Sequence, residues 1–188
     1  MVPTIRTDHT RPVAEVLGHL LDLGHRRIAR VSGPTPLLHT QARTAALLEG
    51  CTAASIKPTI VEGDYSEEAG AKLTAALLRQ PEPPTAILYD NDVMAVAGLA
   101  AAAELDIAVP DQLSLVAWDD STLCRLASPA LTTMSVDVHE FGLTVAESVL
   151  ERIDGVPVTP RWSPTARYIP RGTTAPPPIQ ASSTRGPR

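Results

Sequence analysis

Short apolar runs alternate with amphipathic stretches along the first 120 residues of this chain. Between residues 10 and 24 the apolar side chains have helical spacing, at Val13, Val16, Leu17, Leu20 and Leu21. Thr10 is suited to cap the start of this helix, and Gly24 is suited to end it. Residues 28–32 then form a short, β-branched apolar run that stops at a Gly-Pro pair, which predicts a buried strand.

The same alternation predicts three more helices and three more strands. The helices are expected over residues 41–54, 66–80 and 91–105, and the strands over residues 59–62, 85–89 and 113–118. Strands that alternate with helices through short connections indicate a parallel sheet with helices on both faces. The predicted fold class is therefore α/β.

The rhythm then changes. An extended segment over residues 131–137 leads into a predicted helix over 139–152, and a last strand is predicted over 166–170. This helix and the one over residues 10–24 both have apolar stripes of their own, so we expect a second lobe to cover them. From Thr173 onward the chain is rich in Pro, Ser, Thr and Arg, which predicts a disordered tail.

Composition and charge narrow the range of functions. The 188 residues are 44% hydrophobic and 20% charged, and a net charge of −5 argues against binding of a phosphate backbone by this segment. No apolar run approaches the roughly 20 residues that a membrane span needs. The polar first eleven residues contain no apolar signal core, and Cys51 and Cys124 have neither metal-ligand nor redox spacing. We therefore expect a cytoplasmic protein with two reduced thiols.

Polar and aromatic side chains follow the predicted strands at their carboxyl ends, where open parallel sheets bind ligands. Tyr65 follows the second strand, Asn91 follows the third, and Trp118 and Asp119 end the fourth. Polar groups beside a flat ring suit a sugar or a nucleobase, because the ring covers an apolar face while the polar groups bond hydroxyls or heteroatoms.

Other chemistries have less support. The carboxylates of Asp90, Asp92 and Asp120 suggest a metal, but no His or Glu is spaced to complete a ligand shell, so no metal and no cofactor is expected. The chain lacks the G-x-S-x-G, P-loop, G-x-G-x-x-G and H-E-x-x-H motifs. We therefore expect a binding module rather than an enzyme, although an acid–base carboxylate pair stays open.

Three motifs, in this order, carry a family resemblance: Leu-Gly-His-Arg-Arg-Ile-Ala at residues 23–29, Tyr-Asp-Asn-Asp at 89–92 and Val-Ala-Trp-Asp-Asp at 116–120. Leu-Thr-Thr at 131–133 and Arg-Gly-Thr at 171–173 extend it. Together they resemble the effector-binding core of the lac repressor family (LacI/GalR) of bacterial transcription regulators. The resemblance implies a periplasmic-binding-protein-like fold with one nearly complete lobe and part of a second.

The resemblance also implies five ligand-binding residues. Asp8 matches a loop aspartate before the first helix, Arg43 an arginine that reaches into the cleft, and Tyr65 an aromatic residue that stacks on the ligand. Asn91 and Asp119 match polar contacts to the ligand. Each residue has a structural alternative. Asn91 and Asp119 also suit capping and turns, Arg43 suits a solvated helix surface, Tyr65 suits packing at a lobe edge, and Asp8 suits a frayed end.

The implied organisation has five parts. They are a partial N-lobe over residues 1–27, the C-lobe over 28–131, a return to the N-lobe over 132–155, a final C-lobe strand over 156–172 and a disordered tail over 173–188.

The implied function is that of a sensor core. A small molecule, with a sugar as first candidate and a purine left open, would bind between the lobes and modulate DNA binding of the intact protein. Nothing upstream of Leu23 matches the helix-turn-helix of the family, so operator DNA is expected to be a partner only through a segment that this chain lacks. A homodimer is expected, through residues 66–78, 94–103 and 123–126. The alternatives are a solute-binding protein of the same fold that serves a transporter, and a truncated or headless sensor without DNA binding.

Overall fold

A six-stranded sheet organises most of the chain. The computed structural model describes residues 4–157 and 159–179. The strands lie in the order β3-β2-β4-β5-β6-β8, and every neighbouring pair is parallel except β6 and β8. Their bounds are β2 (Ile28–Ser32), β3 (Thr59–Glu62), β4 (Ala86–Tyr89), β5 (Ser114–Trp118), β6 (Thr132–Ser135) and β8 (Arg167–Ile169). The predicted α/β class with a parallel sheet is confirmed.

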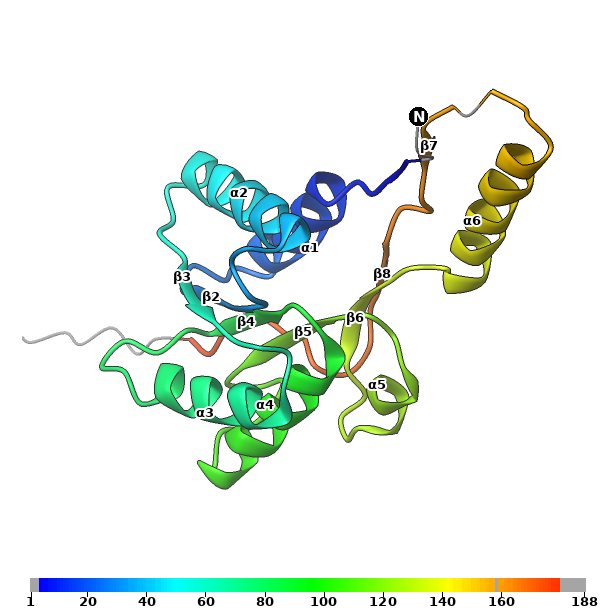
Figure 1. Ribbon diagram of the computed structural model, residues 1–188. Coiled ribbons are helices and arrows are strands. Elements are labelled where there is room, and N and C mark those ends of the chain that lie inside the picture. The colour runs from blue at the N-terminus through cyan, green and yellow to red at the C-terminus, as the bar shows by residue number, and fades with distance from the viewer. Residues whose placement is uncertain (1–3, 158, 180–188) are drawn as a thin grey trace, which may run out of the picture.

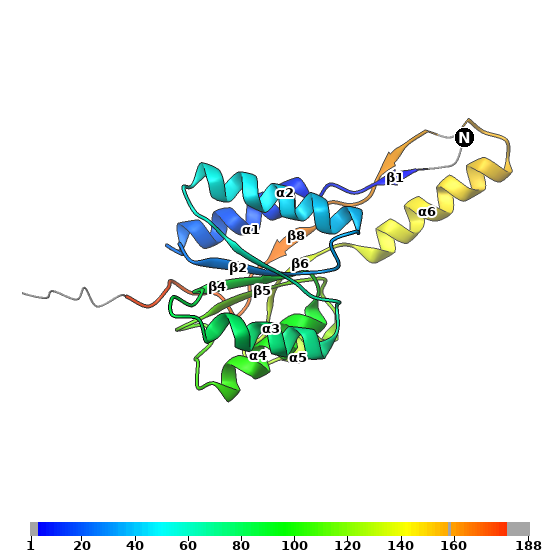
Figure 2. The ribbon, with the colours of Figure 1, turned by 60° about the vertical axis from the view of Figure 1, so that its left-hand side comes forward.

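Helices cover both faces of this sheet, as Figures 1 and 2 show. The pair α1 (Thr10–Asp22) and α2 (Leu38–Ala53) covers one face, and the pair α3 (Glu67–Leu78) and α4 (Asp92–Glu104) covers the other. Two apolar clusters fill the two interfaces, because alternate residues of the central strands point to opposite faces. Ile28 and Leu88 join the first cluster, whereas Ala29 and Ile87 join the second.

Small residues let α3 and α4 approach each other closely. A Cβ atom at Gly70 would lie 2.6 Å from both the Cα and the carbonyl oxygen of Met94. A Cβ atom at Gly98 would lie 2.2 Å from the hydroxyl of the buried Tyr89, which exchanges a 2.7 Å hydrogen bond with Thr74 Oγ1. The Ala- and Gly-rich composition of α4 is therefore a packing requirement on this face of the sheet.

The first helix packs on this sheet and not on a second lobe. Val16 and Leu20 of α1 are fully buried, in one cluster with Ile28, Leu47 and Leu88. The expectation that this helix belongs to a partial N-lobe and needs another lobe to cover its stripe is therefore wrong. Its partners are α2 and the sheet face, and a hydrophobic stripe alone does not specify which layer covers it.

A second group of elements projects away from the sheet (Figures 1 and 2). This projecting segment contains α6 (Val138–Ile153) and a parallel pair of two-residue strands, β1 (Ile5–Arg6) and β7 (Arg161–Trp162). Ser148 is the one buried residue of α6. Large apolar side chains of the segment remain exposed: Val138, Phe141, Leu143, Val145, Val149, Leu150, Ile153, Val156 and Trp162.

Some predictions need further correction. The short helix α5 (Thr122–Leu126) and the strand pair β1 and β7 were not predicted, because two to five residues carry too little periodic signal. The expected disordered tail begins too early. Thr173 is buried and its carbonyl accepts a 2.8 Å hydrogen bond from the amide of Leu115. Residues 180–188 of that tail lie outside the described residues.

No helix within the described part of the chain combines the length and the apolar character that a membrane crossing requires.

Candidate ligand site

A buried ion pair anchors the carboxyl end of the sheet. Arg30 on β2 donates from Nε to Asp90 Oδ1 at 2.9 Å and from Nη2 to Asp90 Oδ2 at 2.7 Å. The backbone amide of Gly33 donates to the same Oδ2 at 2.8 Å. This bidentate, charge-assisted arrangement holds the loop after β2 against the end of β4.

Arg43 enters the same region from α2 and is buried. Its Nη1 donates to the carbonyl of Asp90 at 3.2 Å and lies 3.7 Å from Asp90 Oδ1. Its guanidinium carbon lies 3.6 Å from the centroid of the Trp118 ring, which is a cation–π contact. A gap of about 10 Å³, too small for a ligand, lies beside the pair and is lined by both arginines, by Asp90 and by the Trp118 ring, together with apolar side chains of α1, α2 and the sheet. The prediction of a merely solvated Arg43 is excluded.

Three more rings gather beside the Arg43–Trp118 stack. The imidazole of His9 lies 6.1 Å from that of His39 and 6.3 Å from Trp118, measured between ring centroids. His39 Nε2 forms a 2.7 Å hydrogen bond with the hydroxyl of Tyr65. Burial and the charge of Arg43 lower the pKa of His39, and the same causes with His39 added lower the pKa of His9 to about 4. Both histidines are therefore neutral at pH 7.

Asn91 fixes the backbone that presents Tyr65. Its Oδ1 accepts from the amide of Met94 at 2.9 Å, so it caps α4, and its Nδ2 donates to the carbonyl of Tyr65 at 3.0 Å. Tyr65 has a φ of +69°, a left-handed conformation that needs such support in a residue other than glycine. The predicted cap at Asn91 is present, and its amide also holds the ring at the site.

Asp8 and Asp119 occupy the edges of the site. Asp8 Oδ1 accepts from the amides of Thr10 and Arg11 at 2.9 and 3.2 Å, so Asp8 supplies the cap that was expected from Thr10. Asp119 follows β5 with a φ of +72°. Asp119 is exposed to solvent, but the surrounding protein atoms desolvate its carboxyl enough to raise the pKa, which the charge of Arg43 partly offsets. The structure thus brings Arg43, Tyr65 and Asp119 to one edge of the sheet, with Asn91 and Asp8 holding the adjoining backbone.

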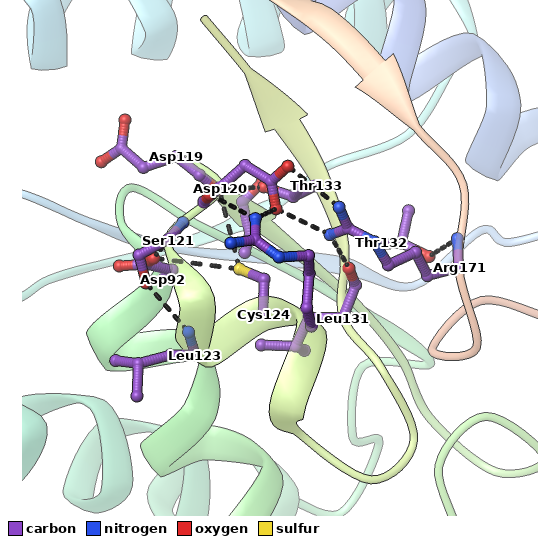
Figure 3. A network of polar contacts seen from close by, with 12 residues as sticks. Asp92, Asp119, Asp120, Ser121, Leu123, Cys124, Leu131, Thr132, Thr133 and Arg171 are labelled. Atoms are coloured by element: carbon purple, nitrogen blue, oxygen red, sulfur yellow. Dashed lines mark hydrogen bonds and ion pairs between the residues drawn. The ribbon is translucent and has the colours of Figure 1, made fainter. Parts of the chain in front are cut away.

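The neighbouring aspartates hold the frame together. Asp92 Oδ2 accepts from the amide of Ser121 at 3.0 Å, and Asp120 pairs with Arg171 at 2.9 Å (Figure 3). Arg171 also donates to the carbonyl of Leu131 at 2.9 Å. With Asp90 bound to Arg30, each of these three carboxylates has a cationic or amide partner. Figure 3 also shows the Asp119 side chain pointing away from this network.

Sequence reasoning missed several members of the site. His39 stands four residues before Arg43, which places both on one face of α2, and His9 directly follows Asp8. Both spacings can be read from the sequence, but the sequence does not show which distant residues lie beside either histidine. The Arg30–Asp90 pair joins residues that are 60 positions apart, and nothing local links them.

The comparison with protein families identifies the domain. The model of the periplasmic binding protein-like domain matches residues 17–174. The chain belongs to this family. Curated relatives place it among the LacI-type regulators, so the resemblance drawn from the motifs is confirmed.

Two repressors illustrate the relationship. The chain is 31% identical over 157 residues to the HTH-type transcriptional repressor CytR of Escherichia coli (strain K12). This match covers 82% of this chain and 46% of CytR. It is 34% identical over 138 residues to the HTH-type transcriptional repressor PurR of Escherichia coli O139:H28 (strain E24377A / ETEC). This match covers 72% of this chain and 40% of PurR. The chain therefore spans less than half the length of these relatives.

Solved structures agree. A LacI family transcriptional regulator from Bifidobacterium animalis subsp. lactis DSM 10140 superposes with a TM-score of 0.90 at 38% identity, over 94% of this chain and 65% of that one. The dimeric Lac repressor with an 11-residue C-terminal deletion superposes with a TM-score of 0.87 at 30% identity, over 92% of this chain and 64% of that one. These relatives are regulators rather than enzymes.

Proposed function

We propose that this chain is the ligand-sensing core of a bacterial transcriptional regulator and that it acts in the cytoplasm. The observation that carries the proposal is the buried Arg43 stacked on Trp118 at the carboxyl end of the parallel sheet. An arginine in this position presents hydrogen-bond donors beside a flat apolar wall, which is the combination that a small polar ring compound needs.

The proposed effector is a small molecule, with a sugar as first candidate. Arg43 and Asp119 would bond its polar groups and Tyr65 would cover its ring. Asn91 would hold the loop that carries Tyr65 and would offer its remaining amide hydrogen. Asp8 would face the ligand from the start of α1. Binding without chemistry is favoured because no nucleophile and base are paired among these residues.

The proposed mechanism is closure of a cleft. The six-stranded sheet with α1–α5, here called the sheet lobe, would form one wall, and a second lobe that includes the projecting segment would form the other. An effector with higher affinity for the closed state shifts the lobes toward it, and it changes operator affinity only by that difference. Operator DNA would be bound by a helix-turn-helix of the intact regulator.

The proposed regulator is a homodimer. The face formed by α3, α4 and α5 is the candidate contact, because Leu123 and Leu126 of α5 are 45% and 76% exposed there. A solved relative is described as the dimeric Lac repressor. Gel filtration of the wild-type chain and of Leu126→Asp checks this: the wild type should elute as a dimer and the variant as a monomer.

Effector binding is tested by thermal shift and calorimetry with a panel of sugars and nucleosides. We expect at least one compound to bind the wild-type chain. Asp119→Asn, which keeps the shape and tolerates a positive φ, should weaken that binding at least tenfold. Asp111→Asn is the matched control, because Asp111 is exposed and precedes β5 at the opposite end of the strand. A panel without any binder, or equal binding by the two variants, would contradict the proposal.

A further inference from the structure

Two buried nitrogen atoms at the candidate site have no hydrogen-bond partner within the described chain. They are His9 Nδ1 and Arg43 Nε. Buried polar atoms in folded proteins are nearly always paired, so two such atoms at one site mark a place where a partner belongs. Neither atom takes part in the contacts that hold the loops together.

The surroundings of these atoms suit a ring. The rings of His9, His39, Tyr65 and Trp118 lie next to one another, with neighbouring centroids 6.1 to 6.3 Å apart. The His39–Tyr65 hydrogen bond fixes the orientation of two of these rings relative to each other. Gly33 leaves the space that the Tyr65 ring occupies, since a Cβ atom there would lie 2.0 Å from the tyrosine hydroxyl.

Carboxylates outnumber arginines at the site. Arg30 is paired with Asp90, and the charge of Arg43 acts on both Asp90 and Asp119. Asp8, whose charge acts on His9, adds a third carboxylate, so two arginines face three carboxylates, and burial keeps His9 and His39 neutral at pH 7. An anionic ligand would meet this excess of negative charge and would lose its hydration for no compensating contact.

Resting on the proposed function, we propose that His9 and His39 are specificity-determining residues and that the effector carries no negative charge. The effector would exchange a hydrogen bond with His9 Nδ1, accept one from Arg43 Nε and lay a ring face against the His39–Tyr65 pair. Neither histidine was among the residues that the family motifs singled out.

The first test compares neutral compounds with ionised ones of the same skeleton on the full 188-residue chain. The pairs are glucose and glucose 6-phosphate, galactose and galacturonate, and uridine and uridine monophosphate. We expect the tightest binder to be neutral and its ionised partner to bind at least tenfold more weakly. Preferred binding of an ionised member would overturn the proposal.

The second test uses the best neutral binder of that panel. His9→Phe keeps the ring and removes both nitrogens, so it should weaken binding at least tenfold. His9→Asn restores a hydrogen-bonding atom near the position of Nδ1 and should stay within about threefold of the wild type. Unchanged affinity in His9→Phe would overturn the role of His9, and equal losses in both variants would assign the residue to folding alone.

A spectroscopic readout separates recognition from folding. Long-range ¹H–¹⁵N spectra of the wild-type histidines should show the side-chain resonances of His9 and His39 moving as the compound is added. His139, which is exposed on α6, should stay unchanged. A compound that binds without shifting the side-chain resonances of His9 and His39 contradicts this inference but not the proposed function. A panel in which no compound binds contradicts both.

Discussion

The sheet lobe and the projecting segment respond differently to the same sequence signal. Both α1 and α6 are amphipathic helices of similar length. In α1 the stripe is covered, and Val16 and Leu20 are fully buried. In α6 Ile153 and Leu150 remain 72% and 59% exposed. A hydrophobic stripe predicts that one face of a helix packs against another element. Whether that face is covered depends on the neighbouring layers.

Polar contacts differ in the same way. The sheet lobe holds its ion pair Arg30–Asp90 with side chains no more than 4% exposed. The projecting segment holds Arg161 against Glu147 and Glu151, with side chains 26% to 64% exposed. Water screens the exposed ion pairs of Arg161 but not the buried Arg30–Asp90 pair. The lobe is therefore expected to set the stability of the chain, and the following predictions separate the two regions.

The largest effect is expected at Asp90. Asp90→Ala leaves two buried arginines without their counter-charge and should reduce the free energy of unfolding by about 3–5 kcal/mol. Arg161→Ala in the projecting segment should cost less than about 1 kcal/mol. Urea unfolding followed by circular dichroism measures both. Similar losses in the two variants would mean that burial does not distinguish the regions.

The next largest effect is expected where helices touch. Gly70→Ala places a methyl group 2.6 Å from the Met94 backbone, so α3 and α4 must separate, at a cost of about 1–3 kcal/mol. Gly142→Ala in α6 is the matched control, because nothing lies within 4 Å of the added atom. A Gly70→Ala variant with the same free energy of unfolding as the wild type in urea would contradict this prediction.

Acid should weaken the lobe through His25. This imidazole is buried and bonds Thr85 Oγ1, Ser114 Oγ and the carbonyl of Ala175. Burial lowers its pKa, so the folded state keeps His25 neutral while the unfolded state binds a proton near pH 6.5.

This contribution of His25 to stability is complete above pH 6.5 and is lost as the pH falls below it, by at most about 1.4 kcal/mol per pH unit. The measurement is the free energy of unfolding of the wild type and of His25→Gln between pH 8 and pH 5. The wild type should show the steeper decline. Parallel curves would show that His25 is not the titrating group.

The smallest expected effect is a gain in stability. Gly18→Ala adds a methyl group to α1 with nothing within 4 Å, and should stabilise the lobe by about 0.5–1 kcal/mol through helix propensity. Gly142→Ala should raise the helicity of α6 and leave the urea midpoint of the lobe unchanged. An equal midpoint shift in both variants would show that α6 unfolds together with the lobe.

Much of the fold was predictable because its signals are local. The strand over residues 28–32 was predicted with the bounds of β2, and the helix over 139–152 lies within α6. The site was predictable only in part. Arg43 and Tyr65 were named from motifs, yet the contacts of Arg43 with Asp90 and Trp118 join three elements that no sequence window contains.

The sequence by itself determined the order of helices and strands, the parallel sheet and the edge at which polar groups collect, since apolar periodicity and strand polarity are properties of short segments. Tertiary structure alone decided that α1 packs on the sheet, that Arg30 pairs with Asp90 and that His9 and His39 face the Arg43–Trp118 stack. These outcomes depend on which distant surfaces meet and on how completely they exclude water, and burial of that kind is a property of the assembled layers.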